Sequence, residues 1–311
     1  MFDGMGGAGG TVYETPEGPR TGAYLASRLA RDVVERRMLA LLDPEWNLDG
    51  AAAAADLRRS VRSALIERLA ELKAPRSGLR SKLLRALPTT MALVALQRRE
   101  PTGQTWALHM LWSGDSRAYV FQPATDAHQL TVDDIRDKGD AMANLREDSV
   151  VSNAMSADTE FQVHHRTLNL TAPFIVIAAT DGCFGYLRSP MHFERMVLTT
   201  LRDSVSTGGW STALQQQIAA VTGDDAAMAV LGVGADHLTF QGLFAERTSV
   251  LDERWVNPID SLAADIEKAE QQLDEARRHQ VQRSAELWAA YKDDYERHQG
   301  SSTAVTEGAA P

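Results

Sequence analysis

Aspartates at the ends of apolar segments are the residues of this 311-residue chain best placed for chemistry. Asp181 ends the apolar run in residues 174–186, and Asp224 and Asp225 come just before a second apolar run, residues 226–233. Short apolar runs bounded by turn residues are typical of strands that are buried on both faces. If these strands are antiparallel, the end of one and the start of the other share an edge of the sheet. The sequence therefore predicts that these acids meet at that edge.

Two further aspartates can join this group. Asp115 lies in a Gly-Asp turn between two alternating segments, residues 105–112 and 118–121, which is typical of a hairpin. Asp3 comes after two residues that fit a short strand and is followed by Gly4. Carboxylates that cluster without nearby Lys or Arg repel one another unless cations bind between them, and Mg²⁺ and Mn²⁺ prefer oxygen ligands. The pattern predicts a site for several metal ions at the edge of a sheet.

Six short motifs follow one another between residue 1 and about residue 235. They are Asp3-Gly4-Met5-Gly6-Gly7, Pro88-Thr89-Thr90, Gly114-Asp115-Ser116-Arg117-Ala118-Tyr119, Leu130-Thr131-Val132-Asp133, Thr180-Asp181-Gly182-Cys183-Phe184-Gly185 and Gly223-Asp224-Asp225. In order and spacing this series resembles the bacterial PP2C-type (PPM) metal-dependent Ser/Thr protein phosphatases. The resemblance implies an α+β fold, a four-layer α-β-β-α sandwich with two central antiparallel sheets, here followed by a C-terminal helical extension.

The resemblance also implies a site and an activity. It implies two Mg²⁺ or Mn²⁺ ions, with a third and weaker one beside them, and the hydrolysis of phosphoserine and phosphothreonine in proteins. Two cations would screen the charge of the phosphate ester and activate a bridging water. Asp3, Asp181 and Asp224 would be catalytic because they hold these ions. The implied metal ligands are Asp3, Gly4 through its carbonyl, Asp115, Asp181, Asp224 and, if the alignment shifts by one residue, Asp225. For Asp115 a second interpretation stays open, because aspartates also cap their own turns.

The family motifs expected before Asp3 have no counterpart in this sequence. Family members carry two strands there, with an acidic metal ligand and often an arginine that binds the substrate phosphate. Three explanations stay open: a start codon assigned too far downstream, a truncated chain, or a degenerate member without activity. The last would be a pseudophosphatase, an interaction module that keeps the sandwich and has lost catalysis. A lipid phosphatase or an adenylyl-type enzyme on the same metals is a third hypothesis.

Composition narrows the classes of partner. The net charge of −10 and a pI near 5.3 argue against non-specific binding to nucleic acid or to an anionic membrane. No apolar run reaches the roughly 18 residues of a membrane span, and the first residues do not resemble a signal peptide. Cys183 is the only cysteine, so an intrachain disulfide is excluded and a cytoplasmic location is expected. We expect Cys183 to be a small buried side chain and not a nucleophile.

Helical periodicity and charge predict the remaining organisation. Amphipathic helices are expected on the outer faces of the sandwich, at residues 22–42, 57–72, 193–201 and 211–221, and loops at residues 11–20 and 137–158.

The predicted domains are a phosphatase domain over residues 1–236, a connector over 237–257, a long charged helix over 258–298 and a disordered tail over 299–311. Apolar residues at alternating steps of four and three in the first half of the long helix make it a candidate coiled coil for self-association or partner binding. A single helix that packs on the phosphatase domain is an equal alternative.

Overall fold

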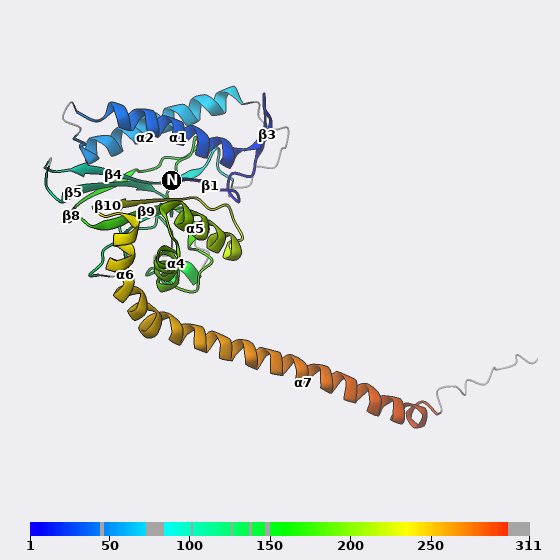
Figure 1. Cartoon of the computed structure of the whole chain (residues 1–311). Coiled ribbons are helices and arrows are strands. Elements are labelled where there is room, and N and C mark those ends of the chain that lie inside the picture. The colour runs from blue at the N-terminus through cyan, green and yellow to red at the C-terminus, as the bar shows by residue number, and fades with distance from the viewer. Residues whose placement is uncertain are drawn as a thin grey trace, which may run out of the picture. The chain divides into compact units, whose positions relative to one another are not determined.

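The computed structural model describes residues 1–43, 47–72, 84–100, 102–125, 127–136, 139–146 and 150–297. The chain forms two units, Met1–Asp252 and a second unit that begins at Glu253, and Figure 1 labels their helices and strands. No helix within the described residues is long and apolar enough to cross a membrane. The tail predicted to be disordered, residues 299–311, lies outside the described residues.

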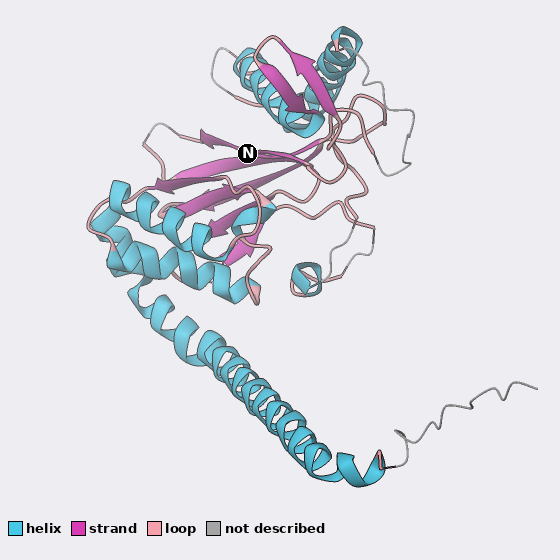
Figure 2. Ribbon diagram, turned by 90° about the vertical axis from the view of Figure 1, so that its right-hand side faces the viewer, coloured by secondary structure: helices cyan, strands magenta, loops and turns pink. Residues whose placement is uncertain are grey.

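Two four-stranded antiparallel sheets form the centre of the first unit (Figure 2). The first sheet has the order β1 (Phe2–Gly4), β4 (Thr89–Arg98), β5 (Thr105–Ser113) and β8 (His164–Thr171). The second has the order β10 (Met228–Val233), β9 (Phe174–Ala179), β6 (Arg117–Phe121) and β7 (Ala127–Gln129). Strands β9 and β10 are antiparallel, as the sequence predicts. Strands β1 and β10 are edge strands of the two sheets.

Helices cover both outer faces of the paired sheets. Helices α1 (Gly22–Ala40) and α2 (Gly50–Glu71) share a core with the first sheet. Helix α4 (Pro190–Asp203) packs on the second sheet through Phe193, which lies 4.8 Å from Tyr119 of β6 between ring centroids. Helices α5 (Thr207–Val221) and α6 (His237–Leu251) pack against α4. The predicted α-β-β-α sandwich is confirmed.

Successive side chains of β5 point into two different hydrophobic cores, one on each face of the strand. Leu108, Met110 and Trp112 point between the two sheets, where they pack with residues of β6 and β9. Leu111 points to the other face and packs under α1 and α2. This follows from the period of two in a strand, which sends successive side chains to opposite faces. Because both faces are covered, β5 is buried along nearly its whole length.

Two segments near the N-terminus are more regular than the sequence predicts. Residues predicted as a loop form a hairpin of β2 (Val12–Thr15) and β3 (Gly18–Thr21). Helix α2 begins at Gly50 and therefore includes the alanine run before residue 57. The Asp49 side chain caps this helix by accepting hydrogen bonds from two backbone N–H groups, which provides the start signal.

The predicted connector over residues 237–257 is wrong in its first part. Residues 237–251 form α6, which belongs to the first unit and buries Phe240, Phe244, Thr248 and Leu251. These four residues lie on one helical face. The sequence hid this face because other large apolar residues of α6 are exposed: Leu238, Leu243 and Val250. A short π-helical turn, Asp252–Val256, follows.

The described part of the second unit is mainly the long helix α7 (Asn257–Tyr295). A charged helix was predicted over residues 258–298, close to the observed bounds. None of the α7 residues is buried. Its apolar side chains are therefore available on the surface of this unit.

Candidate functional site

Four aspartates from distant segments line one pocket of about 450 Å³ in the first unit. Asp3 lies on β1, Asp115 follows β5, Asp181 follows β9 and Asp224 precedes β10. Strand order explains the meeting, because the end of β9 and the start of β10 lie at one edge of their antiparallel pair. The structure thus places around one pocket the four acids that the sequence predicted to meet.

Asp3 is held where β1 runs between β4 and the start of α1. Its backbone carbonyl accepts a hydrogen bond from Oγ1 of Thr89 at 2.5 Å. At the next residue, Gly4, a Cβ atom would lie 2.5 Å from the carbonyl oxygen of Ala23 in α1. Only glycine fits this approach without movement of the helix. The packing therefore fixes the strand that presents Asp3, and Gly4 lies in the same pocket.

Asp181 begins a 3-10 turn, Asp181–Cys183, directly after β9. Its Oδ1 accepts a hydrogen bond from the Gly182 backbone N–H at 2.9 Å. A Cβ atom at Gly182 would lie 2.3 Å from the carbonyl oxygen of Asp225. The adjacent Thr180 bonds to Ala227, whose N–H donates to Oγ1 of Thr180 at 2.9 Å. These contacts hold the segment that carries Asp224 against the tip of β9.

Asp225 is not among the residues that line the acidic pocket. Asp224 and Asp225 are both exposed and both border a second cavity, whereas Asp225 alone also borders a third, which Met1 and Ala226 line. The backbone N–H of Asp225 donates to Oδ1 of Asp224 at 2.7 Å. Of the two adjacent aspartates, the structure therefore places only Asp224 in the acidic pocket, and the metal role suggested for Asp225 has no geometric support.

Asp115 lies in a tight turn that a second acid supports. Gly114 has φ +99°, a conformation that favours glycine. Its N–H donates to Oδ2 of Asp134 at 3.0 Å, and Oδ1 of Asp134 lies 3.0 Å from Nε2 of His164 on β8. Asp115 also accepts a hydrogen bond from its own backbone N–H. A hydrogen bond to Asp134 thus supports this turn, and Asp115 itself lies in the acidic pocket.

Burial and mutual repulsion raise the pKa values of two acids of the pocket, Asp3 and Asp115. Burial, a hydrogen bond with Asp181 and the charges of the other three acids raise the pKa of Asp3 to about 9. Burial and the charge of Asp181 raise the pKa of Asp115 to about 7, although its own backbone N–H opposes this. Both pKa shifts mean that the pocket favours the protonated form of Asp3 and Asp115 over the ionised form. A bound cation would relieve the same repulsion.

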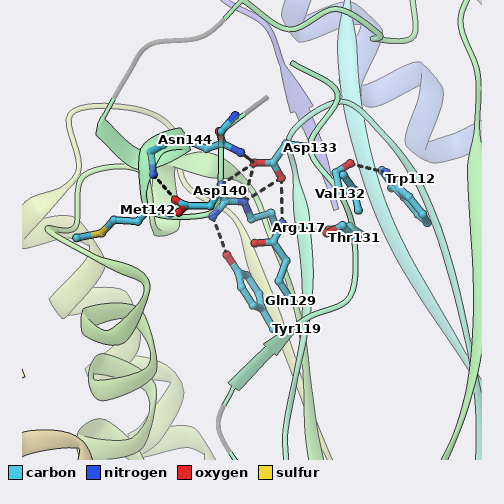
Figure 3. A network of polar contacts seen from close by, with 12 residues as sticks. Trp112, Arg117, Tyr119, Gln129, Thr131, Val132, Asp133, Asp140, Met142 and Asn144 are labelled. Carbon is cyan, nitrogen blue, oxygen red and sulfur yellow. Dashed lines mark hydrogen bonds and ion pairs between the residues drawn. The ribbon is translucent and has the colours of Figure 1, made fainter. Parts of the chain in front are cut away.

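Arg117 is the one arginine that lines the pocket within the described residues. Its guanidinium forms an ion pair with the carboxylate of Asp133 (Figure 3). Its guanidinium donates to Asp133 through Nε at 3.0 Å and Nη2 at 2.6 Å, and both side chains are buried. It also lies 4.4 Å from the ring centroid of Phe184. The buried ion pair with Asp133 therefore occupies this guanidinium.

The donor atoms of the pocket suit a divalent cation that keeps part of its water shell. Among the described residues, no three His, Cys, Asp or Glu side chains converge closely enough to enclose a metal ion. The donor chemistry nevertheless fits, because the pocket offers carboxylates and the backbone of Gly4. Mg²⁺ keeps several waters and is commonly bound through only one or two carboxylates. A hydrated ion therefore suits this pocket better than a fully enclosed one.

The sequence missed several residues of the pocket. Thr90 lines it and shares a hydrogen bond of 2.6 Å with Ser116, which ties β4 to the turn after β5. Asn144, on the short helix α3 (Ala143–Arg146), also lines it, with Nδ2 3.5 Å from Oδ2 of Asp133. Asp133 stood in a recognised motif without an assigned role. Its partner Arg117 was the signal, because a buried guanidinium requires a nearby carboxylate.

Cys183 is buried beside the pocket, in surroundings that disfavour its thiolate. Burial raises the pKa of its thiol to about 11, so it stays protonated at neutral pH. Its Sγ donates to the carbonyl oxygen of Ala227 at 3.3 Å. This confirms the prediction that Cys183 is a small buried side chain.

No protein-family model matches the sequence, and no curated protein matches it either. Among solved structures, a bacterial serine phosphatase matches 73% of this chain and 91% of its own chain, with 13% identity and a TM-score of 0.51. This chain has the PP2C fold. The Mycobacterium tuberculosis serine/threonine phosphatase PstP/Ppp matches 67% of this chain and 80% of its own, with 17% identity and a TM-score of 0.49.

A third match is the catalytic domain of the serine/threonine protein phosphatase PstP in complex with two manganese ions. It covers 71% of this chain and 89% of its own, with 17% identity and a TM-score of 0.48. At these identities the likeness concerns the PP2C fold.

Proposed function

We propose that this chain is a protein phosphatase that depends on Mg²⁺ or Mn²⁺ and hydrolyses phosphoserine and phosphothreonine. The observation that carries the proposal is that four aspartates, from four separate segments, line one pocket of a PP2C fold. A protein gains nothing structurally by gathering like charges in this way. A cluster of acids with so few cationic side chains beside it is best explained by cations that bind in the pocket during catalysis.

Asp3, Asp181 and Asp224 would hold these ions, with the Gly4 carbonyl and Asp115 beside them. When bound, divalent cations screen the charge of a phosphate ester and lower the pKa of water. The proton that Asp3 retains to about pH 9 would have to leave its carboxyl group as cations enter. Cation binding should therefore weaken as the pH falls.

Arg117 would act through the shape of the pocket and not by binding phosphate. Both its Nε and its Nη2 donate to Asp133, and Nη1 lies 3.4 Å from the hydroxyl of Tyr119. A guanidinium with these donors engaged has little capacity for a phosphate oxygen. The substrate phosphate would therefore depend on the cations for its charge compensation.

A second candidate function is a non-catalytic interaction module. It is favoured by one observation, that no group of three potential ligands encloses a metal position within the described residues. In that case the acids would be a remnant, and divalent cations would add little to the stability of the chain. Ligands that bind only the native state raise its stability, so this difference is measurable.

The test combines a thermal shift with an assay on a phosphothreonine peptide. With Mn²⁺ we expect phosphate release that a chelator abolishes, and a higher melting temperature than in the chelator. Asp181→Asn should lower activity by about 100-fold or more, since even the loss of outer-shell partners costs about 10- to 100-fold. Asp236→Asn, at the start of α6 and outside the pocket, is the control. Absence of both activity and a thermal shift would favour the interaction module instead.

A further inference from the structure

Helix α7 carries an apolar stripe along its length, which Glu270, Arg277, Gln280 and Ser284 interrupt near its middle. Eight large apolar side chains of this helix are exposed, at 45–70% of their accessible surface. At about 100° of rotation per residue they fall within roughly 120° of the helix circumference. They are Leu262, Ile266, Leu273, Val281, Leu287, Trp288, Tyr291 and Tyr295.

The stripe follows a repeat of eleven residues and not a heptad. Leu262, Leu273, Ser284 and Tyr295 are each eleven positions apart. The heptad expected from the first half of the helix fails at Gln280 and Arg283, whereas the longer repeat carries the stripe on through residues 281–295. An eleven-residue repeat keeps an apolar face in line along a nearly straight or slightly right-handed pair of helices. This is typical of helices that associate along their length.

The charges of α7 are divided into two blocks. Residues 260–275 contain six acidic side chains and one basic side chain, Lys268, whereas residues 277–283 contain three arginines and no acid. Two parallel copies of α7 in register would set the acidic blocks against each other. Two antiparallel copies, centred between residues 273 and 274, set each acidic block against the basic block of the other copy. In that arrangement Glu270 faces Arg277 of the second helix, and Ile266 faces Val281.

We propose that α7 is a dimerisation helix that pairs antiparallel with α7 of a second copy of this chain. The apolar stripe provides the buried surface, and the two charge blocks select the orientation. Within one helix, Arg277 and Arg283 contact Asp274 and Glu286 at distances of 3.6 and 3.0 Å. These pairs are exposed and contribute little. They therefore leave both arginines free to turn toward a second helix.

The mass of the full chain in solution tests the proposal, by light scattering after gel filtration. We expect twice the 34.0 kDa of one chain. Leu273→Asp, at the centre of the stripe, should weaken the dimer by about tenfold or more. Gln271→Asp is the matched control, because it lies on the opposite face of α7 and should leave the mass unchanged. A monomeric parent chain, as expected if α7 packs only on its own domain, would overturn the proposal. So would a dimer that Leu273→Asp leaves intact.

Orientation needs its own experiment. Glu270→Arg and Arg277→Glu should each weaken the dimer, and the double variant should restore it, because the charges are exchanged across the pair. In addition, a mixture of Ile266→Cys and Val281→Cys chains should form a disulfide-linked dimer that neither chain forms alone. Cys183 is buried and does not compete. Linkage of Ile266→Cys chains to each other, or failure of the double variant to recover, would overturn the antiparallel arrangement. Circular dichroism of each variant verifies that α7 remains helical.

Discussion

Arg117 Nη2 lies 2.6 Å from Oδ2 of Asp133, and this buried ion pair forms one wall of the acidic pocket (Figure 3). Asp133 also accepts a hydrogen bond from Nε2 of Gln129 at 3.1 Å. The pair joins β6 to the segment that follows β7. Removing one partner of a buried ion pair destabilises a protein far more than replacing both partners with apolar residues.

We predict that Arg117→Met costs about 3–5 kcal/mol of unfolding free energy, because it leaves Asp133 buried without its cation. The double variant Arg117→Met, Asp133→Leu should recover most of this loss. Urea denaturation measures both. Arg37→Met removes the comparable but more exposed pair with Asp56 and should cost much less. A single variant at Arg117 as stable as the parent would show that the pair is dispensable.

The raised pKa of Asp3 predicts that stability falls as the pH rises. An unfolded aspartate loses its proton near pH 4, whereas the pKa of folded Asp3 is about 9. Between these values the folded state binds more protons than the unfolded state. The free energy of unfolding should therefore fall with pH, by up to about 1.4 kcal/mol per pH unit for this group.

Denaturation from pH 5 to 9 in a chelator checks this prediction, with Asp3→Asn as the comparison. The difference in stability between the parent chain and Asp3→Asn should grow toward pH 9 in favour of the variant. Mg²⁺ or Mn²⁺ should shrink that difference, since a cation compensates the ionised carboxylates. Parallel pH profiles of the two proteins would be incompatible with the raised pKa.

Close approach at Gly182 predicts a steric requirement for glycine. A methyl group there would meet the Asp225 carbonyl, so Gly182→Ala should push residues 224–227 away from Asp181. We expect a loss of about 1–3 kcal/mol of stability and, if the chain is a phosphatase, a larger loss of activity than of stability. Gly242→Ala, on an exposed turn of α6 with no neighbour within 4 Å, should instead stabilise the protein by about 0.5–1 kcal/mol. Equal effects of the two substitutions would contradict this reading of the contacts.

Much of this arrangement could be predicted from the sequence, for a physical reason. Strands such as β9 are buried on both faces and appear as apolar runs whatever their partners, and an acid at the end of such a run lies at the edge of the sheet. The hairpin of β2 and β3 could not be recognised, because four-residue strands with Pro19 and Gly18 look like a loop. Helix α6 was hidden by exposed apolar residues on its outer face, such as Leu238.

The resemblance favours Asp224 and keeps Asp225 as the alternative, because neighbouring residues differ only in the direction in which the local turn points their side chains. The structure places Asp224 in the acidic pocket and leaves Asp225 outside it. We therefore predict that Asp224→Asn lowers Mn²⁺-dependent hydrolysis by about 10- to 100-fold or more. Asp225→Asn should change it by less than about twofold, because Asp225 lies outside the acidic pocket.

Initial rates over a Mn²⁺ titration separate the two variants. For Asp224→Asn, a weaker apparent affinity for Mn²⁺ should accompany the loss of rate, because the substitution removes a ligand. For Asp225→Asn, the titration should superimpose on that of the parent chain. The reverse result, with Asp225 sensitive and Asp224 tolerant, would mean that the segment before β10 turns the other way when cations bind. That would exchange the roles assigned to these two aspartates.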